Sequence, residues 1–126
     1  MQIKIQNQLL MNSGTIVSEQ PSCRDGYRCW VAISAVPVSY LYKNPDNVPY
    51  IKNLNLRLIP EDAKQFYTVR KVYVDAECIE NDWDLGELIM DFFDVCYSFE
   101  AVLDFLKSRG IDDNGFSEPW NTDYPL

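Results

Sequence analysis

Residues 30–42 (WVAISAVPVSYLY) form the most strand-like run in the sequence, because β-branched and aromatic side chains dominate it. Pro37 interrupts this run, which therefore predicts an edge strand, a bulged strand or two strands joined by a bend. Polar and apolar residues alternate over residues 2–5, 54–58 and 69–79, and this pattern predicts three further strands.

The C-terminal half carries helical patterns instead. Asp84 suits the N-cap of a helix. Apolar residues then recur at helical spacing and predict a helix over residues 84–96; they are Leu85, Leu88, Ile89, Phe92 and Cys96. Ser98 suits the N-cap of a second helix over residues 99–109, which Gly110 would end.

Strand patterns followed by helical patterns predict an α+β fold, with a mainly antiparallel sheet from the N-terminal half and two C-terminal helices packed on one face. A chain of 126 residues is short for two cores, so we expect a single domain over residues 1–126. Hydrophobic residues make up 47% of the chain, which is enough to bury a core. No apolar run has the length of a signal peptide or a membrane span, and we expect a cytoplasmic protein without a membrane partner.

Charge is distributed unevenly along the chain, whose formal net charge is −8. Residues 1–73 hold nine Lys or Arg and five Asp or Glu, a balance of +4, whereas residues 74–126 hold two basic and fourteen acidic residues, a balance of −12. An acidic protein does not follow a phosphate backbone, so direct binding to nucleic acid is not expected. The acidic segment favours a basic partner that it would attract and orient, although it can also be a solvated face that maintains solubility.

The acidic segment supplies the candidate partner-binding residues. On the first predicted helix the carboxylates recur at steps of three and four, which places them on one face, where they repel one another and do not stabilise the helix. Trp83 lies in the same segment, as an interface anchor or as a staple between the helix and the core. The candidate residues are Asp75, Glu77, Glu80, Asp82, Trp83, Asp84, Glu87, Asp91, Asp94, Glu100 and Asp104.

The sequence contains no histidine, which removes the commonest general base, the Ser-His and Cys-His nucleophile pairs and the usual zinc ligand. Glycine-rich phosphate loops and nucleophile motifs are missing as well. We therefore expect no enzyme activity, no catalytic residues, no metal and no cofactor. The four cysteines have irregular spacing and are expected to be reduced, with a redox role for Cys23 and Cys29 as the alternative.

A small acidic α+β domain with carboxylates and aromatic residues on one face resembles bacterial toxin-immunity proteins of the contact-dependent growth inhibition type. The residues that carry the resemblance are 75–94, including Trp83, together with Glu100 and Asp104. The resemblance implies an inhibitor that binds a cognate toxin domain, often a basic nuclease, and neutralises it with acidic residues at or near the active-site cleft. Binding at an exosite, away from that cleft, is the other mode that the resemblance implies.

Two alternatives belong to other classes of protein. A DNA-mimic inhibitor from a phage or mobile element would use its carboxylates in place of phosphates. A small enzyme or ligand-binding domain would need a concave apolar pocket with convergent polar groups.

Overall fold

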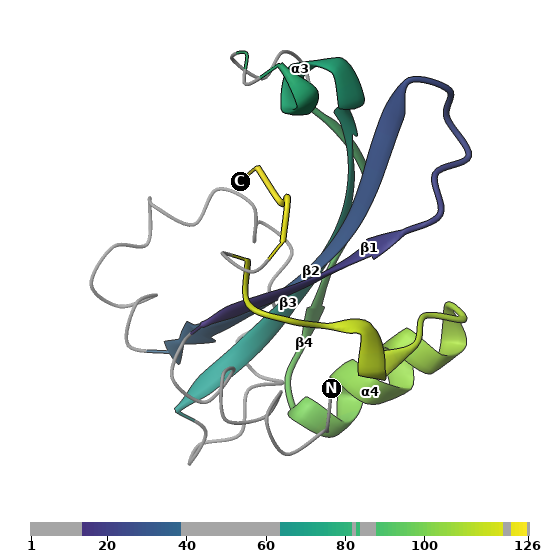
Figure 1. The fold of residues 1–126 in the computed structure, drawn as a ribbon. Helices are drawn as coiled ribbons and strands as arrows, with labels where there is room; N and C mark the ends of the chain where they lie inside the picture. Colours follow the sequence, from purple (N-terminus) through teal and green to yellow (C-terminus); the bar gives the residue numbers. More distant parts are fainter. Residues whose placement is uncertain (1–13, 39–63, 82, 84–87, 120–121, 126) are drawn as a thin grey trace.

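The computed structural model describes residues 14–38, 64–81, 83, 88–119 and 122–125. Within them the chain has an α+β fold with one antiparallel sheet, which confirms the predicted fold class. The four strands are β1 (Thr15–Gln20), β2 (Tyr27–Pro37), β3 (Gln65–Asp75) and β4 (Ile89–Cys96). Strands that are neighbours in sequence are also neighbours in the sheet, in the order β1-β2-β3-β4 (Figure 1).

Helix α4 (Phe99–Ser108) covers one face of the sheet, called here the helix face. Its buried residues Val102 and Leu106 share an apolar cluster with Ile33 of β2 and Val69 of β3, which lie opposite each other in the register. Because side chains alternate along a strand, every second residue of the central strands reaches this cluster.

The helix predicted over residues 99–109 is confirmed, together with both of its ends. The side chain of Ser98 accepts a hydrogen bond from the backbone N–H of Ala101 at 3.1 Å, as an N-cap does. Gly110 follows the helix with φ of 70°, a left-handed conformation that glycine adopts without a Cβ clash.

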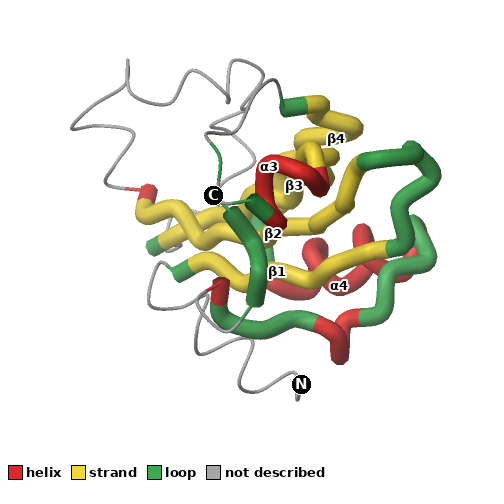
Figure 2. Tube along the Cα trace, turned by 45° about the horizontal axis from the view of Figure 1, so that its top comes forward, coloured by secondary structure: helices red, strands yellow, loops and turns green. Residues whose placement is uncertain are grey.

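The opposite face of the sheet, called here the tail face, buries a second apolar cluster. Trp30, Val72 and Val74 form its centre, and the ring of Tyr124 packs edge-on against Trp30 at a centroid distance of 5.9 Å. Residues 122–125 and helix α4 thus lie on opposite sides of the sheet (Figure 2).

The prediction of a helix over residues 84–96 is wrong for Ile89–Cys96, which is strand β4. Residues 84–87, including the predicted cap, lie outside the described residues. The segment is rich in β-branched and aromatic residues, and its pairing with β3 satisfies backbone groups that would otherwise be unpaired at the edge of a buried strand.

A β-bulge explains why this strand has a helix-like apolar pattern. The β3–β4 register shifts between Lys71 and Val72, where Asp91 is the extra residue on β4. In a regular strand two residues three positions apart point to opposite faces, but the extra residue brings Ile89 and Phe92 to the same face. Their spacing therefore matches a helix although the backbone is extended.

The strand prediction for residues 69–79 is right only up to Asp75, where β3 ends. The side chain of Asp75 accepts a hydrogen bond from the backbone N–H of Glu77 at 2.9 Å and so begins the short helix α3 (Ala76–Glu80). Ile79 of α3 packs against the tail-face cluster, at the end of the sheet.

The other predicted strands have mixed outcomes. The run 30–42 is strand as far as Pro37, where β2 ends, and residues 39–42 lie outside the described residues. The predicted strands 2–5 and 54–58 also lie outside them, and β1 was not predicted.

The C-terminal segment wraps around the outer edge of β1. After the short 3-10 helix η4 (Asp113–Gly115), the ring of Phe116 is buried in the helix-face cluster. Ser117 then pairs with Val17 through two backbone hydrogen bonds of 2.9 Å, which covers part of that sheet edge. In the part of the chain that the structure describes, no helix is both long and apolar enough to cross a membrane.

Candidate functional site

Three of the predicted carboxylates lie together around helix α3. Asp75 caps the helix, and Glu77 and Glu80 follow on it with exposed side chains. The helix has no basic residue in its last turn to offset them. Helix α3 and its cap therefore carry three carboxylates and no cation of their own.

Exposed apolar side chains lie beside these carboxylates. Among the described residues, the large hydrophobic side chains that are exposed are Trp83 at 58%, Leu88 at 40% and Met90 at 44%. Trp83 and Leu88 lie between α3 and β4, and Met90 is the second residue of β4. The backbone N–H of Trp83 donates to the carbonyl of Cys78 at 2.9 Å, which ties the tryptophan to α3. This exposure argues against the predicted staple, because a staple to the core would be buried, and the role of interface anchor stays a prediction.

We call this region the α3–β4 surface and define it by Asp75, Glu77, Glu80, Trp83, Leu88 and Met90. It lies at one corner of the sheet, since β4 begins opposite Tyr73, just before the end of β3. Apolar anchors surrounded by polar and charged residues are typical of protein–protein interfaces.

The remaining predicted residues are distributed differently from the single helical face that the sequence suggested. Asp91 and Asp94 lie on β4, where Asp94 faces Val69 in the register. Glu100 and Asp104 are exposed on α4, at the far end of β4 from α3 (Figure 1). Asp82, Asp84 and Glu87 lie outside the described residues.

Two of these carboxylates have local effects within the chain. A carboxylate oxygen of Asp91 lies 3.4 Å from Nζ of Lys71, so its charge is partly neutralised. Burial raises the pKa of the Cys96 thiol to about 11, and the negative charge of Asp94 adds to the shift. Asp91 and Asp94 therefore interact electrostatically with Lys71 and Cys96 of the same chain.

A cavity of about 330 Å³ lies on the helix face, beside the C-terminal end of α4. Residues from four separate segments line it: Gln20, Pro21, Lys71, Asp91, Phe92, Arg109, Gly110 and Ile111. Sequence reasoning missed this cavity because no local pattern joins these segments. The sequence signals only Arg109, and a cation at the end of a helix is also explained by the helix dipole.

A basic and aromatic cluster continues along the helix face beyond the cavity. The guanidinium of Arg24 lies 5.3 Å from the ring centroid of Tyr73, and Nζ of Lys71 lies 5.8 Å from it. The hydroxyl of Tyr73 is 3.1 Å from Sγ of Cys23, and this hydrogen bond together with burial raises the pKa of Tyr73 to about 12. Burial also raises the pKa of the Cys29 thiol, which lies opposite Tyr73 in the register.

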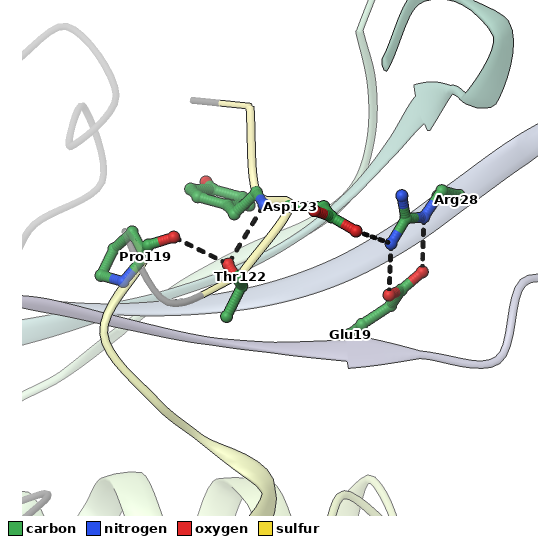
Figure 3. A network of polar contacts seen from close by, with 6 residues as sticks. Glu19, Arg28, Pro119, Thr122 and Asp123 are labelled. Carbon is green, nitrogen blue, oxygen red and sulfur yellow. Dashed lines mark hydrogen bonds and ion pairs between the residues drawn. The ribbon is translucent and has the colours of Figure 1, made fainter. Parts of the chain in front are cut away.

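On the tail face, a polar network holds the C-terminal segment to the sheet (Figure 3). Arg28 donates two hydrogen bonds of 2.7 Å to the carboxylate of Glu19 and one of 3.2 Å to Asp123. Thr122 donates to the carbonyl of Pro119 at 2.9 Å, which makes a turn before Asp123. These carboxylates hold the pKa of Arg28 above its ordinary value. The network links the C-terminal segment to β1 and β2, with two carboxylates around one guanidinium.

All four cysteines are free, and Cys29 and Cys96 are buried. Within the described ranges, no group of three or more Cys, Asp or Glu side chains is arranged to hold a metal ion. Comparison with protein-family models, curated proteins and solved structures finds no match for this chain.

Proposed function

We propose that this protein is an inhibitor of the toxin-immunity type, which binds and neutralises a basic toxin domain through the α3–β4 surface. The observation that carries the proposal is the exposure of Trp83, at 58%, beside Leu88 and Met90 and next to the carboxylates of α3. Exposed apolar side chains that gather in one place cost solubility and mark surfaces that a partner covers.

The charge distribution supports a basic partner. Residues 74–126 carry a balance of −12, and Glu77 and Glu80 stand exposed on α3 without a basic residue in its last turn. Such a field accelerates encounter with a cationic protein, most strongly at low ionic strength. Rim charges of this kind act chiefly on the rate of association.

The apolar residues would determine how long the complex lasts. Tryptophan is enriched among the residues that dominate binding energy, and truncation of such an anchor costs about 2 kcal/mol or more, or about 30-fold in Kd. Trp83 is therefore the residue whose loss would weaken the proposed complex most. Its backbone hydrogen bond to Cys78 holds the main chain at Trp83 in place before binding, which reduces the backbone entropy lost on association.

The experiment uses the toxin domain encoded in the neighbouring reading frame as the titrant. Calorimetry with the intact protein should give saturable binding that weakens between about 0.05 and 0.5 M salt. Trp83→Ala should raise the Kd about 30-fold or more. Co-expression should protect cells from the toxin, and Trp83→Ala should reduce that protection.

A matched pair of charge reversals separates local recognition from net charge. Glu80→Lys changes an exposed carboxylate of the α3–β4 surface, whereas Asp104→Lys makes the same change in charge on α4, at the far end of β4 from α3. The first should slow association more than the second. Equal effects of the two reversals would exclude this surface, and a toxin that is neither bound nor neutralised would refute the proposed function.

A further inference from the structure

The cavity beside the end of α4 contains a cation held in place by aromatic rings. The guanidinium of Arg109 lies 5.0 Å from the ring centroid of Phe92 and 5.3 Å from that of Phe105. The backbone of Arg109 caps α4 by donating to the carbonyl of Leu106 at 3.1 Å. The backbone and the guanidinium of Arg109 are therefore both held in position before any ligand binds.

Among the residues that the structure describes, no carboxylate pairs with the guanidinium of Arg109. Among the described residues, the ion pairs are those of Arg28 with Glu19 and Asp123 and that of Lys71 with Asp91. A guanidinium has five N–H donors in a planar fork that matches the two oxygens of a carboxylate. The donors of Arg109 are therefore available at the cavity.

A second cation lies on the adjacent strand. Lys71 is directly opposite Phe92 in the β3–β4 register, so it is a neighbour of the ring on which Arg109 rests. Its ion pair with Asp91, at 3.4 Å, leaves the cavity with two cations against one carboxylate. The cavity is thus net positive in a chain whose net charge is −8.

The rest of the lining limits the size and polarity of a ligand. Phe92, Ile111 and Pro21 supply apolar surface next to the cations. Gln20 donates one of its two amide N–H groups to Oγ of Ser18 at 2.9 Å, so one N–H remains for a ligand. A volume of about 330 Å³ is near the lower end for ligand pockets, which suits a small molecule.

We propose that this cavity binds a small organic carboxylate with an apolar body. Arg109 receives the carboxylate through paired N–H donors, and Lys71 adds a second positive charge. The apolar body packs against Phe92 and Ile111 and excludes water from the charged contact. An inorganic anion would pair with the two cations but leave this apolar surface exposed to water.

The first test needs no mutation. Titration of the intact protein with benzoate, followed by NMR, should shift the backbone amides of Gln20, Gly110 and Ile111 with a common Kd of about 10 mM or lower, within the range of a fragment of this size. Benzamide has the same shape without the charge and should bind at least about tenfold more weakly, since a charge-assisted hydrogen bond is lost. Equal binding of benzamide, or no saturable binding of benzoate, would overturn the proposal.

Variants then assign the contact to Arg109. Arg109→Gln should weaken benzoate at least about tenfold, and Arg109→Lys should weaken it less, because it retains the charge but not the planar fork. Lys107→Gln is the matched control: it removes an exposed cation of the same helix outside the cavity lining and should change the Kd less than about twofold. Inorganic phosphate that competes as well as benzoate would show an anion site without the apolar selection proposed here.

Discussion

Deletion of Asp91 distinguishes a bulged strand from a helix in residues 89–96. In the bulged register the neighbours of Asp91 already face adjacent residues of β3, with Phe92 opposite Lys71 and Met90 opposite Val72. The deletion therefore removes the bulge and leaves every pair intact. In a helix, the same deletion would rotate the preceding turn by about 100° relative to the following one.

The magnitude follows from what each deletion removes. Loss of Asp91 breaks its ion pair with Lys71, whose side chains are 46% and 24% exposed, and exposed pairs are worth about 0–1 kcal/mol. Deletion of Asp94, a carboxylate on the regular part of the same strand, instead shifts the register by one residue, so that the side chains on one side of the deletion move to the opposite face of the sheet. Phe92 or Cys96 would then leave the helix-face cluster, at a cost of about 2 kcal/mol or more.

Thermal and urea denaturation of the two deletion variants provide the measurement. We expect the Tm to fall by about 4 °C or less without Asp91, and by about 8 °C or more without Asp94. Far-UV circular dichroism should show the same strand content in the Asp91 variant and the wild type. A loss of stability without Asp91 that equals the loss without Asp94 would refute the bulged register.

Three further predictions concern the core, the tail and the thiols. Leu106→Ala should lower the free energy of unfolding by about 2–5 kcal/mol, because Leu106 is buried under α4; urea denaturation would measure it, and half-buried Leu103→Ala should cost less. Tyr124→Phe should lower the free energy of unfolding by about 1 kcal/mol, because it removes the 2.8 Å hydrogen bond that Arg70 donates to the Tyr124 hydroxyl. Tyr27→Phe, at another half-buried tyrosine, is the control, and equal losses of stability would contradict a role for that bond. Burial raises the pKa of the Cys96 thiol from 9.0 to about 11, so the thiol loses its proton at lower pH in the unfolded chain than in the folded one. The free energy of unfolding should therefore fall as the pH rises from about 9 to 11. Cys96→Ala should flatten that decline, and an unchanged slope would contradict the raised pKa.

Local signals were sufficient to predict helix α4. The cap at Ser98 and the left-handed Gly110 lie at the two ends of one short segment, and each acts on the backbone of the helix itself. The strand character of β2 was equally readable, because β-branched residues buried on both faces need no information from distant parts of the chain.

The error over β4 has a different origin. Its apolar spacing satisfies a helix and a bulged strand equally well, and only the backbone groups of β3 decide between them. The candidate site shows the same limit. Sequence reasoning selected the acidic segment and Trp83 as candidates, but it placed Asp91 and Asp94 on a helical face, whereas they lie on strand β4.

The sequence by itself determined the α+β class, the ends of α4 and the concentration of negative charge after residue 73, because these depend on composition and on contacts between residues close in the chain. Only the tertiary structure decided that Trp83 is exposed, that Asp91 sits in a bulge and that Arg109 meets Phe92 at a cavity. Each of these depends on strand register and helix packing, which bring together residues that no local pattern connects.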